Sequence, residues 1–129
     1  MMDINEKIEY WVKIAEMDIL VMEHLYQSGD YHYSLFIGHL VLEKIIKAHY
    51  VKSQLETPPK IHDLVKLAVA SNLKLEKEHI KYLLLANSFN IEARYPEEKL
   101  KFYKSCTKEY CLENIQKIKE MFLWLKSLI

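Results

Sequence analysis

The chain has 129 residues, of which 50% are hydrophobic and 28% are charged, and this composition excludes a disordered protein. Only two glycines and three prolines are present, so turns are few, which argues against a β-sandwich or barrel and for long helices. Eighteen basic residues balance eighteen acidic ones and Arg94 is the only arginine, a charge balance that argues against a general nucleic-acid binder. The length predicts one domain over residues 1–129.

The first predicted helix covers residues 4–27. Its apolar residues recur at spacings of three and four, which is typical of a helix with one buried face. These residues are Ile8, Trp11, Ala15, Ile19, Met22 and Tyr26. Asp3 is the expected N-cap, with Glu6 three residues later as in a capping box. Gly29 is suited to the position just after the helix.

A second helix is predicted over 31–53, with Asp30 as its cap. Its apolar surface comes from Leu35, Val41, Leu42, Ile45 and Ile46. The Thr57-Pro58-Pro59 segment cannot continue a helix, because proline lacks the backbone N–H and clashes with the preceding turn. A stiff linker is therefore expected after this helix.

Three further helices are predicted over 62–71, 76–89 and 107–128. The helix at 76–89 is expected to turn Ile80, Leu83, Leu84 and Leu85 inward. Residues 90–105 contain Pro96 and are expected to form a turn and a short helical piece. The last helix carries an apolar stripe of Cys111, Ile115, Ile118, Phe122, Leu125 and Ile129. The fold class predicted is all-α, an up-and-down bundle of four to five helices.

A cytoplasmic location is expected. The first residues lack the basic-then-apolar order of a signal peptide, and no apolar run approaches the roughly 20 residues of a membrane span. Cys106 and Cys111 are five residues apart, which matches no metal-site spacing, so they are expected to be reduced thiols.

One helix face in the second predicted helix is polar. His39, Glu43 and Lys47 follow each other at spacings of four, and Asp18 lies on or beside the apolar stripe of the first helix. A buried carboxylate needs a partner, so Lys47 is expected to pair with Asp18. Two interpretations stay open, a structural ion cluster that fixes helix register and a ligand or catalytic site.

No metal and no cofactor are predicted. His39 and Glu43 have a spacing that could bind a metal, and His62 could approach them, but this pattern is much looser than a known metal motif. The chain has no glycine-rich loop for a phosphate or dinucleotide.

Several short segments, taken in order, resemble the HEPN family, the higher-eukaryote and prokaryote nucleotide-binding domains. They are Ala15-x-x-Asp18-Ile19, Gly29-Asp30-Tyr31, Phe36 through Glu43-Lys44-x-x-Lys47-Ala48, His62-Asp63-Leu64-x-x-Leu67 and Ala93-Arg94-Tyr95-Pro96. The resemblance implies a bundle of four or five helices that commonly dimerises. It covers most of the chain.

The family has two functional branches. Some members resemble ribonucleases with four to six residues between an Arg and a His, and others pair with small nucleotidyltransferases or bind nucleotides. After Arg94, the positions for such a His hold Lys99, Leu100 and Lys101, so the ribonuclease motif is absent. The sequence also departs from the family at His39 and Leu40, where a Gln pair is common.

The resulting expectation is a non-catalytic HEPN-like module and not an enzyme. It is expected to be a homodimer that acts with a nucleotidyltransferase partner of the toxin–antitoxin type, with a nucleotide as candidate ligand. Aromatic surface from Tyr10, Trp11, Phe122 and Trp124 supports the dimer. The alternative is a metal-independent ribonuclease built on Arg94, Asp18, Lys47 and His62. The candidate site residues are Asp18, His39, Glu43, Lys47, His62, Arg94 and Tyr95.

Overall fold

The computed structural model describes residues 2–129, except for the side chains of Glu92, Ala93 and Pro96. The described residues form six helices and no strand. The helices are α1 (Ile4–Gln27), α2 (Tyr31–Gln54), α3 (Leu64–Ala70), α4 (Lys77–Arg94), α5 (Pro96–Ser105) and α6 (Lys108–Ser127). The all-α prediction is confirmed, and the predicted count of four to five helices is wrong by at least one.

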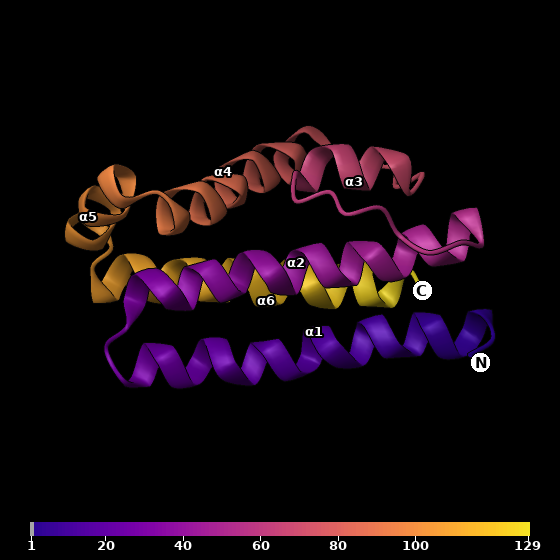
Figure 1. Cartoon of the computed structure of the whole chain (residues 1–129), viewed down its shortest axis with the longest axis horizontal. Coiled ribbons are helices and arrows are strands. Elements are labelled where there is room, and N and C mark those ends of the chain that lie inside the picture. The colour runs from indigo at the N-terminus through magenta and orange to yellow at the C-terminus, as the bar shows by residue number, and fades with distance from the viewer. Residues whose placement is uncertain (1) are drawn as a thin grey trace.

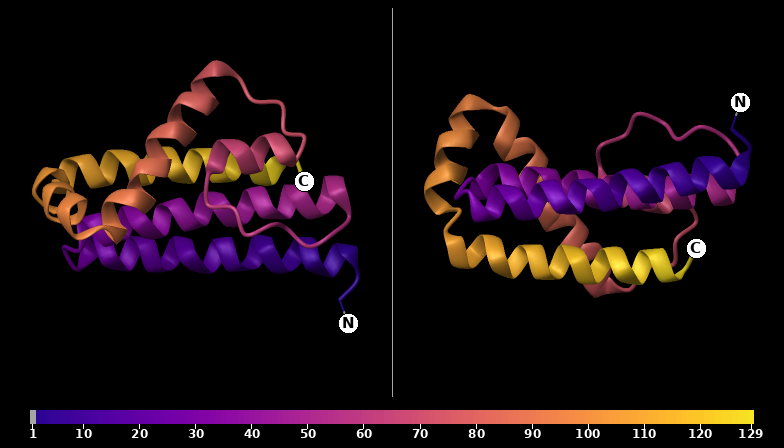
Figure 2. Two further views of the ribbon diagram at one scale, coloured as in Figure 1. Left: turned by 45° about the horizontal axis from the view of Figure 1, so that its top comes forward. Right: turned by 90° about the horizontal axis from the view of Figure 1, so that it is seen from below.

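The three long helices α1, α2 and α6 run side by side along the molecule, and α2 lies at their centre (Figure 1). Helix α4 crosses over α2 and rises away from the bundle towards its N-terminus, while α5 closes one end (Figure 2). Because neighbours surround α2, most of its residues are buried, including its polar ones. The candidate site therefore belongs to the central helix of the fold.

The turn between α1 and α2 is set by a glycine. Gly29 has φ +83°, and its N–H bonds to the carbonyl of Tyr26 while the N–H of Asp30 bonds to that of Leu25. This pair of bonds is a Schellman motif, which needs the left-handed conformation that glycine adopts without strain. The predicted Asp3 cap is confirmed by a bond from the Glu6 N–H. Asp30 occupies the N-cap position of α2 but makes no side-chain capping bond, so that part of the prediction is wrong.

The segment around Pro96 differs from the prediction. Helix α4 continues past residue 89 to Arg94, and Pro96 begins α5 instead of breaking a helix. Proline is well suited to the first position of a helix, because the N–H it lacks has no intrahelical partner there. Residues 90–105 are consequently almost entirely helical.

The inward face of α4 was also predicted incorrectly. Leu83 is buried, but Ile80, Leu84 and Leu85 are exposed. Successive residues of a helix point about 100° apart, so the three consecutive leucines cannot share one face. Among the described side chains of α4, the buried ones instead recur every three positions and are Leu83, Ala86 and Phe89.

The close packing of α2 depends on Gly38. A Cβ at this position would overlap Ile118 of α6 and lie 3.2 Å from the sulfur of Met22 in α1. The predicted stripe of α6 is buried as expected from Cys111 to Leu125, whereas Ile129 is 38% exposed. No helix among the described residues is long and apolar enough to cross a membrane.

Candidate functional site

A buried ion pair lies on α2. Lys47 Nζ donates to Glu43 Oε2 at 3.1 Å, one helical turn away, and both residues are buried. The ring of Trp11, from α1, lies 5.3 Å from the same ammonium and covers it. A cation between a carboxylate and an aromatic face is stabilised by both.

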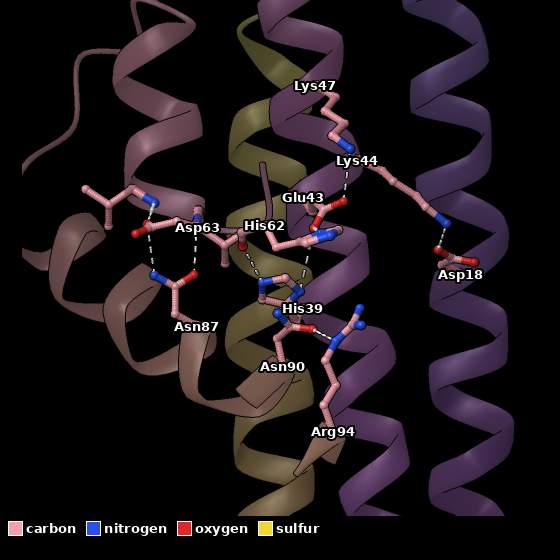
Figure 3. Close-up of polar contacts among 12 residues, drawn as sticks. Asp18, His39, Glu43, Lys44, Lys47, His62, Asp63, Asn87, Asn90 and Arg94 are labelled. Atoms are coloured by element: carbon pink, nitrogen blue, oxygen red, sulfur yellow. Dashed lines mark hydrogen bonds and ion pairs between the residues drawn. The ribbon is translucent and has the colours of Figure 1, made fainter. Parts of the chain in front are cut away.

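His62 completes this group from outside the helix. It lies in the linker after α2, and its Nδ1 is 2.8 Å from Glu43 Oε1 (Figure 3). A carboxylate accepts, so His62 Nδ1 carries the proton and donates it to Glu43. The imidazole side chain is 51% exposed, and its Nε2 makes no hydrogen bond to the described residues. We call Glu43, Lys47, His62 and His39 the polar cluster.

His39 is the most deeply buried member of the polar cluster. Its Nε2 donates to the backbone carbonyl of His62 at 2.9 Å, which ties the linker to α2. Its Nδ1 has no hydrogen-bond partner among the described residues and lies 4.0 Å from Glu43 Oε1. Because Nε2 must carry the proton to donate, Nδ1 of the neutral ring holds only a lone pair.

The position of His62 is also fixed from α4. Asp63 Oδ1 accepts bonds from the backbone of Val65 and Lys66 at the start of α3 and from Asn87 Nδ2 at 3.1 Å. Asn87 Oδ1 in turn accepts from the N–H of Leu64. This two-way contact attaches Asp63 and Leu64, the residues directly after His62, to α4.

The pKa values of the cluster follow from burial and from these bonds. Burial alone raises the pKa of Glu43, but the hydrogen bonds from His62 and Lys47, with the positive charge of Lys47, hold it below its usual value. Burial lowers the pKa of His39, although the nearby Glu43 opposes the shift. At neutral pH the cluster therefore holds an ionised Glu43 beside a neutral His39.

Arg94 lies near this cluster at the C-terminal end of α4. Its Nε donates to Asn90 Oδ1 at 2.7 Å, and its guanidinium lies 5.5 Å from the ring of Phe36 on α2. The side chain is exposed and makes no ion pair with a carboxylate among the described residues. Lys99 Nζ similarly lies 4.7 Å from the ring of Tyr33, one turn before Phe36. We call these four residues the cation–aromatic row.

Three predicted site residues lie outside the polar cluster, namely Asp18, Tyr95 and Arg94, which belongs to the cation–aromatic row. Asp18 pairs with Lys44 and not with Lys47, so that predicted pair is wrong (Figure 3). Lys44 is the residue of α2 that faces α1 at this level, while the ammonium of Lys47 is already bound to Glu43. Tyr95 is 59% exposed between α4 and α5.

Several residues that shape the site were not among the predicted site residues. They include Trp11, Tyr33, Phe36, Lys44, Asn87, Asn90 and Lys99. Spacing on one helix face is a local signal for Asn90, four residues before Arg94, and for Tyr33 and Phe36, three residues apart. No group of three or more potential metal ligands occurs in the described part of the chain.

Comparison with protein-family models gives one finding on identity. The HEPN domain model matches residues 8–128, which is nearly the whole chain. No curated protein and no solved structure gave a match. The matched range includes the polar cluster and the cation–aromatic row. The chain therefore belongs to the HEPN domain family.

Proposed function

We propose that this protein is a non-catalytic HEPN module that binds the phosphate of a nucleotide or of RNA at the cation–aromatic row. Family membership supports a nucleotide-binding or ribonuclease-like helical module. The observation that carries the proposal is Arg94, which is held by Asn90 and Phe36 and left without a carboxylate partner in the described structure. A guanidinium fixed in this way can meet a phosphate in bidentate geometry.

The neighbouring residues suit the same ligand. Lys99 supplies a second cation, and the rings of Phe36 and Tyr33 lie three residues apart on one face of α2. Arginine, lysine and aromatic side chains together are the usual means of holding nucleic acid without reading its sequence. The carboxylate of Glu43 does not repel such a ligand strongly, because Lys47 and His62 already bind it.

Replacing Arg94 by glutamine is expected to weaken nucleotide binding by at least tenfold, since a charge-assisted hydrogen bond contributes about 1.5–3 kcal/mol. Titration of the purified protein with AMP, ATP and a short single-stranded RNA measures the effect. Arg94→Lys keeps the charge but loses the forked geometry of the guanidinium, so its nucleotide affinity should lie between those of the wild-type and Arg94→Gln proteins. Lys66→Gln, an exposed change on α3, is the matched control. Equal affinity of the Arg94→Gln and wild-type proteins would contradict the proposal.

We further propose a homodimer that acts beside a nucleotidyltransferase partner of the toxin–antitoxin type. The support is two unpartnered apolar helix faces. Exposed apolar residues of α1 are Tyr10, Met17, Leu20 and Val21, and those of α4 are Ile80, Leu84, Leu85 and Ile91. Two such faces are more than a small monomer usually exposes. Phe122 does not contribute, because it is 3% exposed and packs in the core.

A second candidate function, RNA cleavage, is favoured by the bond between Glu43 and His62. A buried carboxylate binds Nδ1–H, and Nε2 of this half-exposed side chain has no hydrogen bond to the described residues, an arrangement that suits a general base. In such a reaction His62 would accept the proton of a ribose 2′-hydroxyl, whose oxygen attacks the adjacent phosphorus while the 5′-oxygen leaves.

RNA incubated with the purified protein distinguishes the two functions. If the protein is a ribonuclease, cleavage should fall by about 10²-fold or more in His62→Gln, as expected for loss of a general base. His24→Gln, which replaces an exposed histidine of α1, is the control. Intact RNA with the wild-type protein, together with nucleotide binding that depends on Arg94, would exclude this second candidate and leave the first.

A further inference from the structure

Two cysteines meet where α5 ends and α6 begins. Thr107 is the N-cap of α6, because its hydroxyl accepts a hydrogen bond from the N–H of Tyr110. Cys106 therefore precedes the cap, and Cys111 is the fourth residue of the helix. Side chains at these two positions commonly pack on each other at the start of a helix, an arrangement known as the hydrophobic staple. Here both positions of the staple hold a thiol.

The two thiols are in hydrogen-bond contact. The bond from the Cys106 thiol, together with a weaker one from Ser34 on α2, holds the pKa of Cys111 below its ordinary value, although burial opposes the shift. As a neutral thiol, Cys111 donates to the carbonyl of Tyr31 at 3.6 Å, which links the first turn of α6 to the start of α2. Of the two sulfurs, Cys111 is thus the one favoured as a thiolate.

Burial determines which oxidants suit this pair. Cys111 is fully buried and Cys106 is 4% exposed, and both belong to the hydrophobic core. Thr107, directly after Cys106, is exposed, so solvent lies next to the pair along the chain. A small opening of the joint between α5 and α6 therefore admits an oxidant of the size of hydrogen peroxide but not a bulky disulfide. Oxidation should be slower than that of an exposed thiol.

We propose that Cys106 and Cys111 are a site of reversible oxidation by hydrogen peroxide, at which an intramolecular disulfide ties the end of α5 to the first turn of α6. The Cys111 thiolate attacks one oxygen of the peroxide and the O–O bond breaks. The leaving hydroxide takes up the proton that Cys111 released, which gives a sulfenic acid and water.

The second step closes the disulfide. The Cys106 sulfur attacks the sulfenic sulfur, so the S–S bond forms while the S–O bond breaks. The leaving hydroxide takes up the Cys106 proton and becomes a second water. The two sulfurs together lose two electrons, and the peroxide gains them.

The neighbouring thiol determines the product. A sulfenic acid that meets no thiol is oxidised further to sulfinic and sulfonic acids, which a thiol reductant does not reverse. Here the second thiol already contacts the first, so the disulfide forms before a second peroxide arrives. A dithiol reductant then restores both cysteines.

The disulfide acts on the joint between α5 and α6. The hydrogen bond from Cys111 to Tyr31 is lost, because the sulfur no longer carries a proton. A covalent bond instead holds the end of α5, the helix that places Lys99 over the ring of Tyr33. Oxidation should therefore slow amide hydrogen exchange at residues 102–111 by about tenfold or more, since a cross-link restricts the opened form of the joint.

Peptide mapping of the peroxide-treated protein tests the site. Trypsin cuts after Lys104, Lys108 and Lys117, so the two cysteines fall in separate peptides, 105–108 and 109–117. We expect these peptides as one linked species that a dithiol reductant separates, in a chain that migrates as a monomer without reductant. Sulfoxide at Met17, which is 56% exposed, shows in the same digest that the peroxide has acted.

A matched control moves one thiol by a single residue. The double variant Ser105→Cys with Cys106→Ser keeps the number of cysteines, but residue 105 is exposed and is not a staple position. It should form no link between its two cysteines within one chain. Circular dichroism checks that this variant folds.

Several results would overturn the proposal. They are unmodified thiols in wild-type protein whose Met17 is oxidised, sulfinic or sulfonic acid at either cysteine without the linked peptides, and a link that joins two chains. An equal yield of the intramolecular link in the control variant would also overturn it, because the staple would then not determine the pairing. Unchanged hydrogen exchange in the oxidised protein would overturn the tether between α5 and α6.

Discussion

Replacing Glu43 by alanine is expected to lower the free energy of unfolding by about 3 kcal/mol, the lower end of the usual cost of removing one partner from a buried ion pair. Lys47 would keep its charge at a position only 9% exposed, with Trp11 above it and no carboxylate beside it. His62 would lose its acceptor as well, but its exposed side can turn to water. Urea unfolding at pH 7.5 measures the change.

A matched double variant separates the charge from the packing. Glu43→Leu combined with Lys47→Met removes both charges and keeps similar side-chain volume, so its stability should lie near the wild-type value or above it. A loss as large as that of Glu43→Ala in this double variant would show that the cost arises from packing and would contradict the ion-pair explanation.

The same double variant also decides between the two roles left open for the cluster. If it folds and binds the nucleotide with wild-type affinity, then Glu43 and Lys47 have a structural role. If its stability is unchanged but nucleotide affinity or RNA cleavage falls, then the cluster acts at the site, where Glu43 positions His62.

The helices could be predicted from the sequence because their signals are local. The three- and four-residue spacing from Ile8 to Tyr26 places α1 within the bounds observed, and Gly29 ends it through its own backbone conformation. The start of α5 at Pro96 was missed, because proline both ends helices and begins them. Which of these it does depends on the residues that pack around it.

The site was predictable only where its contacts stay within one helix. Glu43 and Lys47 are four residues apart, and that spacing alone places them in contact. The pairing of Asp18 with Lys44 depends on how α1 is rotated against α2, which spacing does not determine. Asn87 meets Asp63 from a helix 24 residues away, so no local pattern indicated it.

Acidification below pH 6.5 is expected to destabilise the protein through histidines buried on α2. Burial lowers the pKa of both His39 and His49 from the ordinary value of 6.5, and backbone carbonyls opposite them only partly offset the shift. The unfolded chain therefore binds these protons more readily than the folded one. The stability that these two histidines contribute is fully present above pH 6.5. It is lost as the pH falls towards their lower pKa values in the folded protein.

Each such histidine should reduce the free energy of unfolding by about 1.4 kcal/mol per pH unit in this range. Glu43 does not contribute to the pH dependence in this range. Its pKa in the folded protein is below the unfolded value of 4.5, so its protonation changes the stability only below pH 4.5. His49 Nε2 bonds to the carbonyl of Leu125 at 2.7 Å, a bond that a glutamine amide can also donate. Urea unfolding between pH 7.5 and 5.5 should thus show a shallower pH dependence for His49→Gln than for the wild-type protein, because one histidine no longer takes up a proton on unfolding. Identical slopes in the two proteins would mean that protonation of His49 is not linked to unfolding.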